Sequence, residues 1–78
     1  MEIKCYSNEH GIRCELYVDQ EYEGVLYFER AKSKYIRKPI MGGWVCVDAK
    51  ISEGLYSKVN ITPTQLIDAC YKEFQHNS

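Results

Sequence analysis

The stretch that decides the fold is TPTQLIDACYKEFQ, residues 62–75. Thr62 is a good helix N-cap, Pro63 suits the first helical position, and Gln65 completes a capping box with Thr62. Beyond the cap, apolar side chains recur every three or four residues and so form one stripe along a helix. They are Leu66, Ile67, Cys70, Tyr71 and Phe74. The pattern predicts a helix over residues 63–75 with one apolar face to bury.

Residues 12–18 alternate between apolar and polar side chains, which is typical of a strand with one buried face. A turn signal over residues 8–11 precedes them, and residues 2–7 form the strand before it. A hairpin with Ser7 opposite Ile12 pairs apolar residues on the inner face and favourable polar partners on the outer face. The predicted pairs are Cys5 with Cys14, Ile3 with Leu16, Lys4 with Glu15, Tyr6 with Arg13 and Glu2 with Tyr17.

The middle of the chain predicts more strands. A strand over residues 25–30 follows a turn region at 19–24, although Val25–Ile36 can also be interpreted as a helix. Residues 44–51 form a strong strand in which odd-numbered and even-numbered residues point to opposite faces. Residues 55–61 are a candidate for a further short strand. We therefore expect an α+β fold, one domain over residues 1–78, with an antiparallel four- to five-stranded β-meander and one C-terminal α-helix packed on one face.

Composition excludes several classes of protein. The 78 residues are 45% hydrophobic, with a net charge of −1 and a pI near 6.1, so the chain is not a generally basic nucleic-acid binder. The longest uncharged runs have nine residues, too short to span a membrane. Lys4 falls where a signal peptide needs apolar residues, and four cysteines without such a signal indicate a reducing compartment. We expect a cytoplasmic protein that does not enter the membrane.

No pattern of residues indicates catalysis. Cys5, His10 and Cys14 lack the paired Cys-x2-Cys spacing of zinc sites, and we interpret the cysteines as core residues, with a cross-strand disulfide as the alternative. His10 lies in a turn and His76 near a terminus, so neither is placed to activate a cysteine. Gly42-Gly43 lacks the lysine of a phosphate loop. We expect no enzyme activity, no metal and no cofactor.

Two candidate binding surfaces remain. The outer face of the predicted sheet carries tyrosine and arginine, which are enriched at protein interfaces. Its candidate residues are Tyr6, Arg13, Tyr17 and Tyr27. The second surface is a basic segment with five cations in nine residues, Arg30, Lys32, Lys34, Arg37 and Lys38, around Tyr35. The alternatives are an ordinary solvated sheet face for the first and a solvated hairpin tip for the second.

These surfaces predict a binding function. Our first hypothesis is a small non-enzymatic protein-interaction module, such as an inhibitor or regulator that masks a surface of a larger protein or assembly. The alternative is a small nucleic-acid-binding protein that uses the basic segment from Arg30 to Lys38. The acidic stretch from Glu15 to Glu23 would repel phosphates and favours a protein partner. A homo-oligomer stays open at this stage.

Overall fold

A computed structural model describes residues 1–31 and 40–76 of the chain. In these residues the elements are β1 (Glu2–Asn8), β2 (Gly11–Val18), β3 (Glu21–Arg30), β4 (Ile40–Met41), β5 (Trp44–Ile51), α1 (Leu55–Val59) and α2 (Pro63–His76). The strands form one antiparallel sheet in the order β1-β2-β3-β5-β4. The predicted α+β fold, with a meander and a C-terminal helix, is confirmed.

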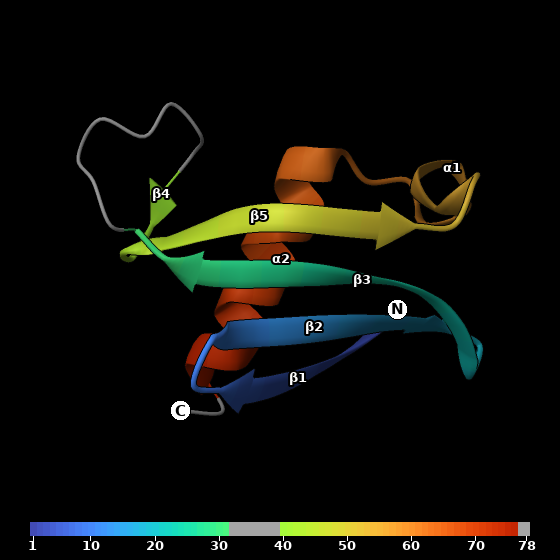
Figure 1. Ribbon diagram of the computed structural model, residues 1–78. Helices are drawn as coiled ribbons and strands as arrows, with labels where there is room; N and C mark the ends of the chain where they lie inside the picture. The colour runs from blue at the N-terminus through green and yellow to red at the C-terminus, as the bar shows by residue number, and fades with distance from the viewer. Residues whose placement is uncertain (32–39, 77–78) are drawn as a thin grey trace.

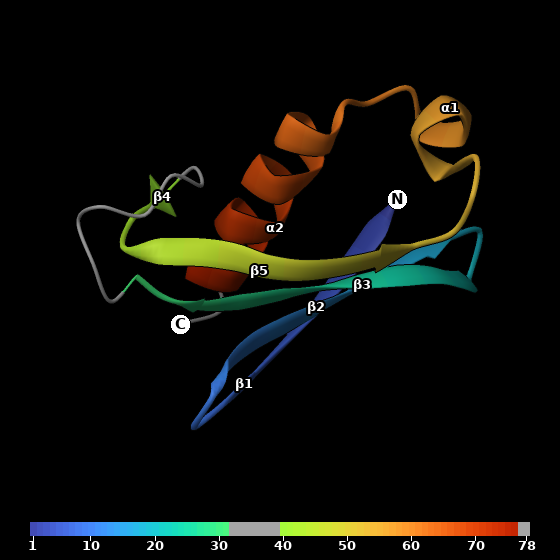
Figure 2. The same ribbon diagram turned by 45° about the horizontal axis from the view of Figure 1, so that its top comes forward.

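The core lies between the sheet and the helices on one side of it. Figure 1 looks onto the opposite side of the sheet, and α2 passes behind the strands; Figure 2 shows α1 and α2 together on the same side. The fully buried side chains come from β2, β3, α1 and α2, and they are Leu16, Leu26, Leu55, Leu66, Cys14 and Cys70. Because both helices lie on the same side, they cover only one face of the sheet. The described helices leave the other face uncovered, although Val25 and Val45 on it are buried.

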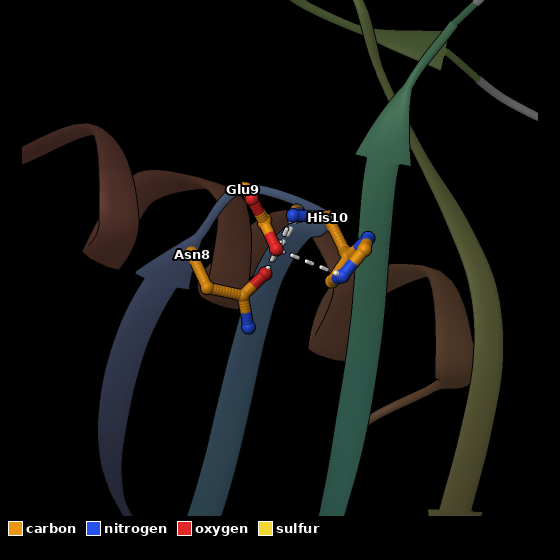
Figure 3. Close-up of polar contacts among 4 residues, drawn as sticks. Asn8, Glu9 and His10 are labelled. Atoms are coloured by element: carbon orange, nitrogen blue, oxygen red, sulfur yellow. Dashed lines mark hydrogen bonds and ion pairs between the residues drawn. The ribbon is translucent and has the colours of Figure 1, made fainter.

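The predicted hairpin of β1 and β2 is confirmed pair by pair. The structure pairs Cys5 with Cys14 and Tyr6 with Arg13, and every other predicted pair is also present. The turn is fixed by the side chain of Asn8, whose Oδ1 accepts hydrogen bonds from the backbone N–H of His10 at 2.7 Å and of Gly11 at 3.1 Å (Figure 3). Gly11 has a φ of +153°, and a Cβ on it would collide with the carbonyl oxygen of Phe28. A glycine is therefore required there.

Helix α2 begins as predicted. The backbone N–H of Gln65 donates to Thr62 Oγ1 at 3.1 Å, and the N–H of Thr62 donates to Gln65 Oε1 at 2.8 Å, which is the complete capping box. At the other end of the helix, Phe74 packs edge-to-face against Phe28, Trp44 and Tyr71. The capping box thus fixes where the helix begins, and Phe74 fixes its C-terminal part to β3 and β5.

Strand β3 begins four residues earlier than the sequence predicted. The turn before it consists only of Asp19 and Gln20, with φ of 51° and 70°. Two positive φ values in a row define a type I′ hairpin turn, which usually contains Asn-Gly or Asp-Gly. Because Gln20 stands where glycine is expected, the sequence did not mark this two-residue turn and extended the turn region to Gly24. The helical alternative for residues 25–36 is wrong as far as Arg30, and residues 32–36 lie outside the described range.

The predicted short strand over residues 55–61 is wrong, because Leu55–Val59 forms helix α1. Leu55 is fully buried, and Tyr56 and Val59 pack against the same core cluster. Gly54 and Asn60 flank the helix in the left-handed conformation, and the N–H of Asn60 bonds to the carbonyl of Tyr56. One helical turn buries these three side chains on one side, whereas a strand would point Leu55 and Tyr56 to opposite faces.

Two β-bulges change which way side chains point. Val47 is an extra residue in β5, because Tyr27 pairs with Asp48 and Phe28 pairs with Cys46. The strict alternation predicted for residues 44–51 is therefore wrong beyond this point, and Ile51 lies on the same face as Trp44. Glu23 is the extra residue in β3, since Leu16 pairs with Gly24 and Tyr17 pairs with Tyr22.

The bulge at Glu23 connects the sheet to α1. Its carboxylate is buried and accepts a hydrogen bond at 2.8 Å from Lys58 Nζ, and its backbone carbonyl accepts one from the N–H of Ser52. The Lys58 ammonium, together with a hydrogen bond from Ser52, lowers the pKa of Glu23, although burial opposes the shift. The folded state therefore favours the ionised carboxylate.

We expect Leu66→Ala to lower the free energy of unfolding by about 2–5 kcal/mol, because it opens a cavity between α2 and the sheet. Thr64→Ala, at an exposed position of the same helix, should change it by less than about 0.5 kcal/mol. Urea denaturation followed by circular dichroism measures both. A Leu66→Ala variant as stable as the wild type would contradict the role of α2 as the cover of the core.

We expect Glu23→Gln to reduce the acid sensitivity of folding. A lowered pKa contributes stability above the ordinary glutamate pKa of about 4.3, and this contribution disappears as the pH falls through the folded-state value. The stability difference between wild type and variant should be constant above about pH 5 and shrink below it. Glu53→Gln, in the exposed turn before α1, is the matched control. Urea titrations across this range measure the difference, and a pH-independent value would contradict the ion pair.

Candidate protein-interaction surface

Three cross-strand rows of side chains cover the face of the sheet that points away from α2. The register of β1, β2, β3 and β5 sets the rows. The first contains Tyr6, Arg13, Tyr27 and Asp48; the second contains Lys4, Glu15, Val25 and Lys50; the third contains Glu2, Tyr17 and Tyr22. We call these three rows the tyrosine face, because four of the chain's seven tyrosines lie in them.

The tyrosines of this face are accessible. Tyr6, Tyr22 and Tyr27 are 47%, 55% and 36% exposed. Tyr17 packs edge-to-face against Tyr22 with ring centroids 5.8 Å apart. Tyr22 was not among the residues predicted from the sequence, because the sequence placed it in the turn region at 19–24. In the structure it lies in β3, and the bulge at Glu23 puts it on the tyrosine face. No signal in the sequence marks that bulge.

Cations lie against two of these rings. The guanidinium of Arg13 lies 5.1 Å from the ring centroid of Tyr6, and its Nε is 3.5 Å from Glu15 Oε2. Lys4 Nζ lies 4.8 Å from the ring centroid of Tyr17 and 3.8 Å from Glu2 Oε1. Such contacts are individually weak at exposed sites. Together they restrict the side chains before any partner arrives.

The hydroxyl of Tyr17 completes this arrangement. It donates a hydrogen bond at 3.1 Å to Glu15 Oε1, and this bond raises the pKa of the Tyr17 phenol. The carboxylate of Glu15 thus accepts a hydrogen bond from Tyr17 with one oxygen and pairs with Arg13 through the other. The positive and negative charges on the face are largely balanced by their own neighbours.

A shallow hollow adjoins the first row. It has a volume of about 120 Å³ and is lined by Arg13, Tyr27 and Glu29 together with the β1–β2 turn. Figure 3 shows that turn, with the carboxylate of Glu9 directed at the imidazole of His10, 3.4 Å away. Both side chains are largely exposed. The hollow gives the face a recess beside Tyr27 at its turn end.

Arg30, the cation of the basic segment that lies in the described range, is separated from the tyrosine face. Arg30, at the end of β3, places its guanidinium 4.3 Å from the ring centroid of Trp44. Trp44 packs against the core on the helix side of the sheet, so Arg30 lies on the opposite side from Tyr27. The other candidate residues of this segment, Lys32, Lys34, Tyr35, Arg37 and Lys38, lie outside the described range. The four sheet candidates therefore share a surface, and Arg30 does not belong to it.

The cysteines of the hairpin are core thiols. Cys5 Sγ and Cys14 Sγ are 3.1 Å apart, which confirms that they are cross-strand neighbours. Burial raises the pKa of Cys5, and a hydrogen bond with Cys70 raises that of Cys14, so both thiols stay protonated at neutral pH. Protonated thiols are poor nucleophiles. Among the described residues, no group of three or more histidine, cysteine or acidic side chains is arranged to hold a metal ion.

None of the helices in residues 1–31 and 40–76 is both long enough and apolar enough to cross a membrane. Comparisons with known proteins found no match, whether with family models, curated proteins or solved structures. Its function must be inferred from the surfaces themselves.

Proposed function

We propose that this chain is a small non-enzymatic protein-interaction module, an inhibitor or regulator that masks a surface of a larger protein through the tyrosine face. The observation that supports the proposal is the gathering of four tyrosines and Arg13 on a sheet face that the described helices do not cover. Tyrosine and arginine are the residue types most often found among interface hot spots.

The arrangement of these side chains suits a contact surface. A tyrosine ring buries a large apolar area with only two rotatable bonds to fix, and its hydroxyl keeps a hydrogen-bonding group. The strands position the rings, and Arg13 and Lys4 restrict the rings of Tyr6 and Tyr17 further. Binding would therefore cost the side chains of this face less conformational entropy than it would cost the side chains of a flexible loop.

The charges on the face favour a protein partner over nucleic acid. Arg13 lies beside Glu15, and Lys4 lies beside Glu2. A phosphate backbone that approached either cation would also meet a carboxylate, and the repulsion would cancel much of the attraction. Nucleic-acid binding through Arg30 to Lys38 is the alternative, and Arg30 is already stacked on Trp44.

We expect Tyr27→Ala and Arg13→Ala each to weaken binding of the partner by about 2 kcal/mol or more, which is about 30-fold, because tyrosine and arginine are typical hot-spot residues and these two pair across β2 and β3 in the first row of the face. Lys72→Ala, on the exposed side of α2, is the matched control and should leave binding unchanged. Affinity capture from the native cell identifies the partner, and titration calorimetry with the purified partner measures the affinity.

Thermal melts of the three variants must first show that each folds. A partner that binds the Tyr27→Ala and Arg13→Ala variants as tightly as the wild type would contradict binding through the tyrosine face.

We expect no sub-micromolar binding to DNA or RNA at physiological salt. Fluorescence anisotropy with single- and double-stranded oligonucleotides, at several salt concentrations, measures this. If the alternative function held, affinity would fall steeply with salt, and each lost phosphate contact would reduce the slope of log affinity against log salt by about 1. Tight binding that Lys32→Ala and Lys34→Ala weaken would support the alternative instead.

A further inference from the structure

β1 forms one edge of the sheet. It pairs with β2 over seven residues, Glu2–Asn8, in unbroken register, and no other strand in the described part of the chain pairs with it. Its outer backbone N–H and C=O groups therefore point away from the sheet, where they can form hydrogen bonds with a further strand.

The two edges of the sheet differ in how they are protected. On the far side, β4 pairs only with Trp44 and Val45 of β5, and the rest of β5 contains the bulge at Val47. A bulge twists a strand and prevents regular pairing with a further strand. β1 has no bulge and no proline. Of the two edges, β1 is the one whose geometry accepts a further strand.

We propose that a second copy of this chain adds to that edge. The two β1 strands would pair antiparallel about a twofold axis at Ile3, so that the two sheets join into one. This inference concerns the strand edge and does not depend on the proposed function of the tyrosine face.

Side-chain direction limits the register of such a pair. Ile3 and Cys5 point to the core side, and Glu2 and Lys4 point to the tyrosine face. Residues directly opposite each other in an antiparallel pair share a face, so a register that places core-side residues against outer residues is excluded. The axis must then pass through a residue. Cys5 is the middle of Glu2–Asn8, and Ile3 and Lys4 lie between it and the start of the strand. An axis at Tyr6 or Ser7 pairs no opposite charges, so the candidates are Ile3, Lys4 and Cys5.

Charge selects Ile3 among these candidates. With the axis at Ile3, Glu2 faces Lys4 of the second copy twice, once on each side of the axis. With the axis at Lys4, the two Lys4 side chains face each other, which is unfavourable. With the axis at Cys5, Lys4 faces Tyr6 and Glu2 faces Asn8, so no opposite charges meet. Only the first register brings opposite charges together.

The core side favours the same register. Ile3 is half-buried and packs against the core cluster at the edge of the sheet. At the axis the two Ile3 side chains would meet and remove each other's remaining apolar surface from water. An axis at Ile3 pairs residues 1–5 of the two copies and leaves the rest of β1 unpaired, so the contact buries less than the area of a standard stable interface, about 1,600 Å². We therefore expect a weak dimer that forms as the concentration rises.

A pair of charge variants tests the register. Glu2→Lys makes both positions positive and Lys4→Glu makes both negative, so each variant alone would repel its own copy. Sedimentation velocity over a concentration series should show that the wild type dimerises. The dimer dissociation constant should be at least about tenfold higher for each variant alone and should return toward the wild-type value in the equimolar mixture. Recovery places residues 2 and 4 of the two copies against each other at the dimer contact, because these are the positions at which the two variants carry opposite charges. The register itself follows from the wild type, whose two Lys4 side chains would repel each other with the axis at Lys4.

Three outcomes would overturn the proposal: a wild type that stays monomeric into the millimolar range, variants that dimerise as well as the wild type, or a mixture that shows no recovery. Lys50→Glu changes the same row of the tyrosine face but lies on β5, so it is the matched control and should dimerise like the wild type. Loss of the dimer in this control would also contradict an edge at β1.

Folding of the variants needs a separate safeguard. The new carboxylate in Lys4→Glu faces Glu15 across the hairpin and removes the cation above Tyr17. Thermal melts report whether this unfolds the chain. If it does, Glu15→Gln is added to both variants and to the wild type, and the same three measurements are repeated, with the same outcomes for and against the dimer.

Discussion

The contact between α2 and the inner face of β1, β2 and β3 is the constraint on which the rest of the structure depends. Leu66, Cys70 and Phe74 of α2 meet Leu16, Leu26 and Phe28, and this contact encloses most of the apolar core. A chain of 78 residues buries only about two thirds of its unfolded surface, so it has no second core to rely on. The capping box at Thr62 and the aromatic contacts of Phe74 fix the two ends of the helix.

This constraint also creates the exposed surface. In the described part of the chain both helices lie on one side of the sheet, so the strands must carry residues on the other side that tolerate water. Tyrosine suits this position because its ring packs on neighbouring side chains while its hydroxyl stays hydrated. The tyrosine face is therefore compatible with the fold alone, and what distinguishes it is the placement of Arg13 and Lys4 over two of its rings.

The sequence predicted the elements whose side chains form a recognisable pattern on both of their faces, and it missed the features that have no such pattern. The hairpin register followed from favourable pairs on both faces, and all the predicted pairs are present. The bulges at Glu23 and Val47 depend on how β3 fits between two neighbours, which no local pattern records. Tyr22 was missed as a member of the tyrosine face because the predicted turn at 19–24 covered it, whereas β3 begins at Glu21. Helix α1 was missed because its five residues bury their side chains only through tertiary contacts.

The balance of charge on the tyrosine face bears on how it would recognise a partner. Arg13 already pairs with Glu15 on β2, and Lys4 already pairs with Glu2 on β1. The face therefore has little net electrostatic field to attract a partner from a distance. Binding would then come from the rings of Tyr6, Tyr22 and Tyr27 and would change little with salt once formed. Specificity would come from the cations, because a partner that failed to replace their present contacts would leave them desolvated and unpaired. A shallow aromatic surface with balanced charges thus favours one well-fitted partner over many loosely attracted ones.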